Sequence, residues 1–464
     1  MEYYDGGVKN IKIAYIGGGS RGWAWGLMSD LSREKVLSGT VSLYDIDHEA
    51  AENNAIIGNK LSARDDVLGK WKYEVAESLE KALTGSDFVI ISILPGTFKE
   101  MESDVHAPEK YGIYQSVGDT VGPGGIVRGL RTIPMYVEIA EAIKKYSRDA
   151  WVINYTNPMT LCVRTLYEVF PEIKAFGCCH EVFGTQKLLA EAINDIMHEE
   201  KVLREDIEIN VKGINHFTWI DRASYKGIDL IPIYKKFADK YYEEGFDDGG
   251  DDNWMNNSFK FAHRIKFDLF KNFGLIAAAG DRHLAEFVPG KWYLKDKETV
   301  KSWKFGLTTV KWRMDDLEKR LEKSRKLVNG EMEFEINETG EDGVKQIKAL
   351  LGLGDLVTNV NLPNRGQISN LPLGAVVETN ALFRKDFVSP VIAGPIPSNI
   401  NSMVMRHVNN VETVLKAGLN KDKNLALTAF VNDPLVTCTF DEAKELFNEM
   451  LQNTAKYLPK EFFK

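Results

Sequence analysis

Two residues of this 464-residue chain, Cys179 and His216, are candidate metal ligands because thiolates and imidazoles both bind transition metals. Their spacing matches no zinc-finger pattern, and two ligands are too few for a closed structural site. Such a pair would leave coordination positions open to a bound molecule, as a catalytic metal requires. The alternatives are a small buried thiol and an ordinary histidine within a strand.

Asp281 and His180 are candidates for proton transfer. Asp281 lies between Gly280 and Arg282 in a run rich in ionisable residues, where a carboxylate can acquire a shifted pKa and act as a base. The reference pKa of histidine, about 6.5, suits His180 to either role. The alternatives are an aspartate in a turn, and a histidine that only supports its neighbour Cys179.

The element that must position these residues begins with a strand at 11–16 and a helix at 23–33. Between them lie Gly17, Gly19 and Gly22 in the spacing G-x-G-x-x-G, with Ser20 inside it. Strand, glycine turn and helix N-terminus together form a binding site for a dinucleotide pyrophosphate. Asp45 ends a strand at 41–45 and favours NAD over NADP, because a carboxylate repels a 2′-phosphate. A structural turn and a helix-capping aspartate are the alternatives.

Further apolar runs at 71–76, 88–94, 151–155 and 174–177 predict strands of a parallel sheet buried on both faces. Asn154 and Asn157 end the third of these strands, at the edge where open α/β sheets bind ligands, although a turn before proline explains Asn157 equally well. Residues 95–132 predict a long functional loop containing Arg128 and Arg131, followed by a helix at 133–145.

Beyond residue 185 we expect a second domain, which gives the division 1–185 and 186–464. Residues 207–220 predict one strand with His216 inside it. Residues 246–253 predict a solvated acidic loop, and residues 359–366 predict another loop. The remaining periodic runs predict helices at 311–326, 406–418 and 440–455.

Composition excludes several classes of protein. A net charge of −9 with both signs interspersed argues against nucleic-acid binding, and no apolar run is long enough to span a membrane. The acidic N-terminus does not read as a signal peptide. Four cysteines, two of them adjacent, predict free thiols in a reducing cytoplasm.

Several motifs occur together in order, and together they resemble family 4 glycoside hydrolases, which depend on NAD and a divalent metal. They are residues 17–20, 118–125, 154–158, 179–180 and 213–216. The runs 177–186 and 279–287 look most like the bacterial α-galacturonidase branch. The resemblance implies an α/β fold: a Rossmann-like, mostly parallel sheet, plus an α+β C-terminal domain like that of lactate and malate dehydrogenases.

The resemblance also implies an unusual hydrolysis. NAD oxidises C3 of the sugar, a base removes the C2 proton, the glycosidic oxygen is eliminated, water adds, and the hydride returns. It assigns Cys179 and His216 to the metal, Asp281 to the base, and Asp119 to a position that tunes the base. Where the phospho-α-glucosidases have an aspartate proposed as the acid, this chain has His180, which we therefore expect to protonate the leaving group.

For ligands, the resemblance implies NAD bound by Gly17, Gly19, Ser20, Gly22, Asp45 and Asn157, a sugar bound by Asn154, and Mn²⁺, with Co²⁺, Ni²⁺ or Fe²⁺ as alternatives. A uronate needs a cationic partner, and we expect Arg128, Arg131 or Arg282 to supply it. The expected substrate is a small α-linked uronide or oligogalacturonide, and the expected assembly is a homodimer or homotetramer. An α-glucuronidase, an α-galactosidase, an ordinary NAD-dependent dehydrogenase and a catalytically inactive dinucleotide-binding regulator are the alternatives.

Overall fold

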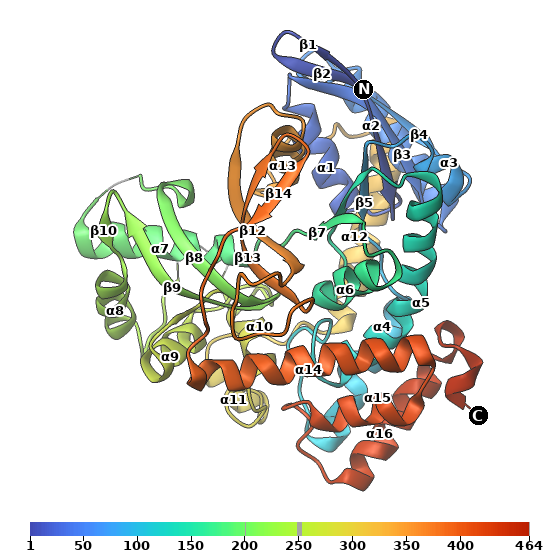
Figure 1. Ribbon diagram of the computed structural model, residues 1–464. Helices are drawn as coiled ribbons and strands as arrows, with labels where there is room; N and C mark the ends of the chain where they lie inside the picture. Colours follow the sequence, from blue (N-terminus) through green and yellow to red (C-terminus); the bar gives the residue numbers. More distant parts are fainter. Residues whose placement is uncertain (200, 248–252, 464) are drawn as a thin grey trace.

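The computed structural model describes residues 1–199, 201–247 and 253–463, so residues 248–252 of the predicted acidic loop lie outside the described residues. Its N-terminal part is built on a parallel sheet, as predicted (Figure 1). The strands run in the spatial order β4-β3-β2-β5-β6-β7, the order of dinucleotide-binding domains. Their bounds are β2 (Gly7–Ile16), β3 (Leu37–Tyr44), β4 (Trp71–Val75), β5 (Phe88–Ile91), β6 (Trp151–Asn154) and β7 (Lys174–Gly177).

Both faces of this sheet are buried, which explains the unbroken apolar runs. In β5, Phe88 and Ile90 face one hydrophobic core, and Val89 and Ile91 face the other. The first core is covered by α1 (Trp23–Ser32) and α2 (His48–Ser62), and the second by α3 (Leu79–Leu83), α5 (Gly122–Tyr146) and α6 (Met159–Val169). The sheet therefore presents its carboxyl edge, where the glycine turn lies, between two helical layers.

The prediction of one long loop over residues 95–132 is wrong. The segment contains α4 (Phe98–His106) and a 3₁₀ helix, η1 (Ala107–Tyr111), and α5 begins at Gly122 rather than at 133. The glycines serve close packing: a Cβ on Gly124 would lie 2.7 Å from the carbonyl oxygen of Asp104. Of the predicted loop, only residues 95–97 and 112–121 lie outside helices, and the second of these segments carries Asp119.

The C-terminal half continues the same sheet with antiparallel strands. Residue Asn361 of β12 pairs with Gly177 of β7, and the order continues β13-β8-β9-β10. The added strands are β12 (Leu356–Pro363), β13 (Val376–Arg384), β8 (Ile207–Ile214), β9 (Phe217–Tyr225) and β10 (Ile228–Asp229), and the short β1 (Glu2–Tyr4), β11 (Ile276–Ala277) and β14 (Phe387–Pro390) pair alongside β2, β9 and β13. The predicted division at residue 185 thus crosses a continuous sheet.

Two predictions for the C-terminal half are wrong. Residues 207–220 form the hairpin β8–β9 rather than one strand, and His216 lies in its two-residue turn with a positive φ of 63°. Residues 359–366 largely belong to strand β12, where Asn359 and Asn361 are buried. Buried hydrogen bonding explains the second error: both asparagines donate to the carboxylate of Glu378 on β13, so polar residues occupy a strand interior.

The remaining helices fall into three groups. α7 (Glu181–Met197), α8 (Ile231–Lys240) and α9 (Arg264–Phe273) pack on the β8–β9 hairpin, and α10 (Asp281–Phe287) and α11 (Lys297–Ser302) follow. The helices α14 (Ser398–Asn420), α15 (Lys423–Asn432) and α16 (Phe440–Asn453) pack against α5 and are followed by the short 3₁₀ helices η3 (Ala455–Tyr457) and η4 (Lys460–Phe463), whereas η2 (Arg204–Asp206) contacts α7. α12 (Val310–Asn329) and α13 (Gly343–Leu350) return to the N-terminal half, where α12 contacts α2 and α4.

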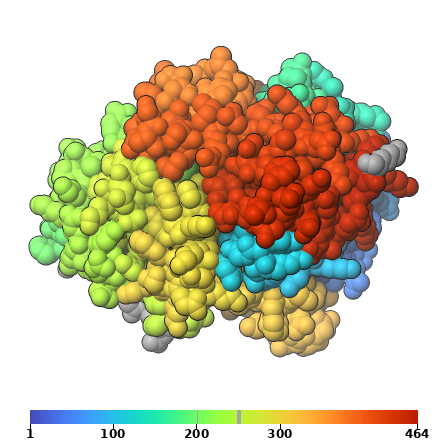
Figure 2. Space-filling model, turned by 90° about the horizontal axis from the view of Figure 1, so that it is seen from below, coloured from blue at the N-terminus to red at the C-terminus, as the bar shows by residue number. Residues whose placement is uncertain are grey.

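The two halves are interleaved rather than laid side by side. In Figure 2 the cyan segment around residues 98–115 lies between yellow residues from the middle of the chain and the red C-terminal helices. Within the described part of the chain, every helix is too short or too polar to cross a membrane.

Candidate active site

The glycine turn follows β2 and leads into α1, as predicted. Gly17 has a φ of 95°, and a Cβ there would lie 1.9 Å from the carbonyl oxygen of Ser92. The amides of Gly17 and Gly18 both donate to the carbonyl of Tyr44, at 2.9 Å each. Only glycine fits this crossing, because any side chain would collide with the neighbouring strand.

Two side chains hold the rest of the turn. The carboxylate of Asp45 accepts the amide of Gly19 at 2.8 Å, directly after β3. Asn54 on α2 donates to the carbonyl oxygens of Gly18 (2.8 Å) and Ser20 (3.0 Å). Asn54 was missed in the sequence because an asparagine within a helix carries no local signal of such a role.

Three predicted or neighbouring residues meet at a second location. The ligand atoms of Asp119, His216 and His283 lie within 4.8 Å of one another. They come from the segment before α5, the β8–β9 turn and α10. The rings of the two histidines are stacked, with centroids 3.8 Å apart. His283 was missed, although its position two residues after Asp281 in the same motif was a usable signal.

The protonation of this group suits a divalent cation. Burial, together with the neighbouring His283, lowers the pKa of His216 to about 3, and burial also lowers the pKa of His283. Burial alone would raise the pKa of Asp119, but His283 and Arg128 hold it below its usual value. At neutral pH the group therefore offers two imidazole lone pairs and one carboxylate.

Thr120 decides which nitrogen of His216 is free. Its hydroxyl donates to Asp119 at 2.7 Å and lies 2.9 Å from Nδ1 of His216. A hydroxyl has one proton, so it must accept from Nδ1, which leaves the lone pair on Nε2. Nδ1 of His283 is buried without a hydrogen-bond partner among the described residues. The imidazole nitrogens and the carboxylate of this group therefore fit a metal ion.

Cys179 is buried and stands outside this three-residue group of the described chain. Burial raises the pKa of its thiol well above the usual value, and its sulfur contacts the side chain of Asn215, the residue before His216. The charge of Glu181 acts on the pKa of both Cys179 and His216. The fold thus brings the two predicted ligands to the same region, because Cys179 contacts the residue that precedes His216 in the β8–β9 turn.

His180 ends the β7 connection at the start of α7. Its Nδ1 lies 2.6 Å from a carboxylate oxygen of Glu341, and its ring centroid lies 6.3 Å from that of Trp23 beside the glycine turn. Burial lowers the pKa of His180, but Glu341 outweighs it and raises the pKa to about 9. His180 is therefore protonated at neutral pH and can donate a proton.

Asp281 is fully buried at the start of α10. Its two carboxylate oxygens accept the amides of Ile265 and Lys266, each at 3.2 Å, at the N-terminus of α9. Burial raises the pKa of Asp281 to about 6, although the nearby Lys266 opposes it. Such a carboxyl can exchange a proton near neutral pH, but in this state both oxygens stabilise a helix terminus.

The two predicted asparagines differ in surroundings. Asn154 is buried and satisfied internally, with its oxygen 2.5 Å from the Tyr136 hydroxyl and its amide donating to Thr156. Asn157 instead faces the metal-ligand group, where its amide lies 3.4 Å from Asp119. Its side-chain oxygen is buried without a partner among the described residues. Of the two asparagines, Asn157 is therefore the one whose side chain contacts the metal-ligand group.

Two of the three predicted arginines, Arg131 and Arg128, also differ in their surroundings. Arg131 is fully buried, pairs with both carboxylate oxygens of Asp104 and donates to the carbonyl of Pro95. Arg128 donates through Nε to the carbonyl of Asn157 at 3.0 Å, while its Nη1 is buried with no partner in the described ranges. Arg131 therefore stabilises the fold, whereas Nη1 of Arg128 is left to donate a hydrogen bond to a ligand.

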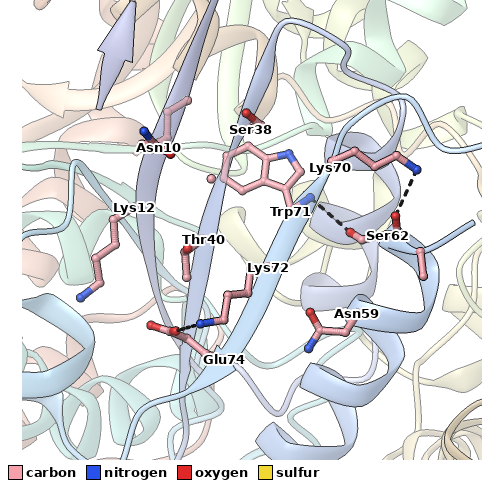
Figure 3. Close-up of a pocket in the computed structure, with 13 residues that line it drawn as sticks. Asn10, Lys12, Ser38, Thr40, Asn59, Ser62, Lys70, Trp71, Lys72 and Glu74 are labelled. Atoms are coloured by element: carbon pink, nitrogen blue, oxygen red, sulfur yellow. Dashed lines mark hydrogen bonds and ion pairs between the residues drawn. The ribbon is translucent and has the colours of Figure 1, made fainter.

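A surface groove elsewhere is unrelated to this site. It is lined by residues of β2, the start of β3, the end of α2 and β4, and Figure 3 shows Lys70 bonded to Ser62 and Lys72 paired with Glu74 on the same strand. These residues lie toward the amino ends of the strands. Open α/β sheets bind ligands outside the carboxyl ends, where the glycine turn lies.

A sheet in the strand order of dinucleotide-binding domains, with three residues beside its carboxyl edge that could hold a metal ion, is typical of proteins that bind a dinucleotide and a metal. Comparison with known proteins defines the family. Residues 12–195 match the model for "Family 4 glycosyl hydrolase", and residues 211–436 match that for "Family 4 glycosyl hydrolase C-terminal domain". The chain belongs to family 4 of the glycosyl hydrolases and is an enzyme of that family. The predicted family is confirmed.

Individual relatives extend over nearly the whole chain. The chain is 69% identical to an alpha-galacturonidase of Thermoanaerobacterium saccharolyticum over 99% of this chain and 98% of that protein. The crystal structure of lplD from Bacillus subtilis superposes with a TM-score of 0.91 at 53% identity, covering 96% of this chain and 100% of that one. A 6-phospho-alpha-glucosidase from gut microorganisms, in complex with NAD and Mn²⁺, shares the fold with a TM-score of 0.79 at 21% identity, covering 97% and 99%.

Proposed function

We propose that this enzyme is an α-galacturonidase that hydrolyses small α-linked galacturonides, including short oligogalacturonides. It would use NAD and a divalent cation, for which Mn²⁺ is our first choice and Co²⁺, Ni²⁺ and Fe²⁺ are the alternatives. The observation that carries the proposal is the 69% identity, over 99% of the chain, to a relative named alpha-galacturonidase. A small sugar ligand also suits a site built from buried donors rather than from a large surface.

The chain's own residues divide between the two cofactors. The glycine turn at 17–22, with Asp45, would hold NAD, and Asp119, His216 and His283, with Cys179 close by, would hold the cation. When bound, NAD supplies a reversible hydride acceptor and the cation polarises sugar oxygens. Cys179 would join the ligands only by losing its proton, which a bound cation promotes.

We infer three proton and charge roles, each supported by one observation. His180, protonated through Glu341, donates to the departing glycosidic oxygen. Asp281 takes the C2 proton, since a pKa near 6 leaves it ionised at neutral pH. Arg128, rather than Arg131, binds the carboxylate of the sugar that is cleaved, because its Nη1 has no acceptor among the described residues.

The assignment is tested with 4-nitrophenyl α-glycosides of galacturonate, glucuronate and galactose in the presence of NAD⁺, Mn²⁺ and a thiol. We expect rapid release of nitrophenol from the galacturonide alone. Faster cleavage of the glucuronide or galactoside would replace the proposal with those activities. Accumulation of NADH in proportion to substrate would identify a dehydrogenase instead.

The cation ligands are tested by equilibrium dialysis of Mn²⁺ against variants. We expect His216→Ala and His283→Ala to lower Mn²⁺ affinity by about 10- to 100-fold each, the cost of losing one ligand or its support. Cys179→Ser tests whether the thiol is a further ligand. A loss of Mn²⁺ affinity equal to that of the histidine variants would make Cys179 a ligand, and unchanged Mn²⁺ affinity would show that it is not. Unchanged affinity in both histidine variants would contradict the site.

Location and assembly are also proposals. The four cysteines are free in the described structure, which suits a reducing compartment such as the cytoplasm. A homodimer or homotetramer remains our expectation from the family resemblance, and light scattering of the purified protein measures it.

A further inference from the structure

Three arginines lie near the proposed cation-binding group of Asp119, His216 and His283, and the sequence analysis did not single out one of them, Arg313. Arg128 comes from α5, Arg282 from α10, and Arg313 from the first turns of α12. Burial lowers the pKa of Arg128 and Arg282, and the charge of Arg313 adds to the lowering of both. Arg282 and Arg313 lie 4.7 and 6.0 Å from the ring centroid of Phe259.

These arginines lack the carboxylate partners that other arginines have. Arg131 pairs with Asp104 and Arg204 with Asp342, but none of the three forms an ion pair within the described residues. Each also keeps one buried N–H without an acceptor there: Nη1 of Arg128, Nε of Arg282 and Nε of Arg313. Arg128 and Arg282 are only 5% and 6% exposed, and a buried N–H without an acceptor is costly, so both sites favour an acceptor supplied by a ligand.

The three groups define two positions for anions. Arg128 donates to the carbonyl of Asn157, whose side-chain amide lies 3.4 Å from Asp119, so it belongs to the cation side. Arg282 and Arg313 instead flank Phe259, which is 41% exposed and packs edge-on against Trp312 at 4.8 Å. Arg282 is fixed from behind by Ser116 and Thr308. An exposed aromatic ring with two guanidinium groups beside it suits a sugar that carries a carboxylate.

We propose that Arg313, together with Arg282, binds a carboxylate on the leaving-group side of the substrate, while Arg128 binds that of the sugar being cleaved. The inference rests on the proposed function and narrows it: the site is built for substrates that carry at least two uronate carboxylates. Arg313 is thus a specificity-determining residue for the leaving group. Two bound carboxylates would also offset the mutual repulsion of the three cations.

The test compares two substrates that differ in the leaving group. Hydrolysis of α-1,4-digalacturonate and of 4-nitrophenyl α-galacturonide is measured for wild type, Arg313→Met and Arg313→Lys, with NAD⁺ and Mn²⁺. We expect Arg313→Met to raise KM for digalacturonate by about 10- to 100-fold, as loss of a charge-assisted contact does. KM for the nitrophenyl substrate should change less than about twofold, and Arg313→Lys should recover part of the loss for digalacturonate.

Arg325→Met is the matched control, since Arg325 lies about 18 Å further along the same helix and pairs with Glu322 and Glu331 on the surface. It should leave both KM values unchanged. Calorimetry of digalacturonate binding distinguishes a failure of the Arg313 inference from a failure of the α-galacturonidase proposal. If wild type binds and cleaves digalacturonate but Arg313→Met affects both substrates alike or neither, the Arg313 inference is wrong and the α-galacturonidase proposal stands. If wild type neither binds nor cleaves any galacturonide, both are wrong.

Discussion

Neighbouring side chains set the protonation of the residues that we propose for metal binding and proton transfer. Thr120 fixes the tautomer of His216, and Glu341 holds a proton on His180. Neither contact links residues close in the chain, since Thr120 and His216 are 96 residues apart. A donor's identity can be read from a sequence, whereas its protonation depends on which groups the fold brings to it.

A prediction at the residue scale concerns His180 as the leaving-group acid. His180→Asn keeps a polar side chain but cannot donate a proton to the glycosidic oxygen. We expect hydrolysis of digalacturonate, which has a poor leaving group, to fall by about 10²- to 10⁴-fold. The nitrophenyl substrate, whose leaving group needs no proton, should lose less than about tenfold, because the effect is confined to leaving-group protonation. Equal losses for both substrates, measured as kcat/KM, would exclude the acid role.

At the scale of elements, Glu286 on α10 holds the segment that carries Asp119. One of its carboxyl oxygens accepts the amides of Val117 at 2.7 Å and Gly118 at 3.0 Å. Burial raises the pKa of Glu286 to about 8, so the group is mostly neutral at pH 7. A neutral glutamine can therefore take its place.

We accordingly expect Glu286→Gln to keep Mn²⁺ affinity within about threefold of wild type, since it retains the acceptor. Glu286→Leu leaves two buried amides without an acceptor, which costs about 2–5 kcal/mol in the free energy of unfolding. It should also weaken Mn²⁺ binding, because Asp119 follows directly after Gly118. Urea unfolding and dialysis measure the two effects, and a leucine variant with normal Mn²⁺ affinity would show that Glu286 does not position Asp119.

At the scale of the whole molecule, the packing of the C-terminal helices against the hairpin makes stability sensitive to acid. His407 on α14 is buried beside Phe217 and Phe287 and contacts the carbonyl oxygen of Phe287 at 2.8 Å. Burial lowers the pKa of His407 to about 4, against about 6.5 in an unfolded chain. Its contribution to stability is thus complete above pH 6.5 and is lost as the pH falls toward 4.

Between pH 7 and pH 5 this residue alone should lower the free energy of unfolding by about 2 kcal/mol, since the unfolded chain takes up the proton first. His407→Gln can still donate to Phe287 but does not titrate. Urea unfolding of both proteins at the two pH values checks this. If the variant loses as much stability as wild type, other groups cause the acid sensitivity.

The sequence by itself determined the parallel sheet, the glycine turn and the family, because these follow from local periodicity and from motifs in order along the chain. Residues Gly17 and Asp45 lie where their neighbours in sequence put them. Only the tertiary structure decided that Arg131 pairs with Asp104, while Nη1 of Arg128 has no acceptor among the described residues, and that Arg313 lies beside the same aromatic ring as Arg282. It also decided that Asn359 and Asn361 lie in a strand, since Glu378 on the neighbouring strand satisfies their amides. Such roles depend on partners distant in sequence, which no local pattern records.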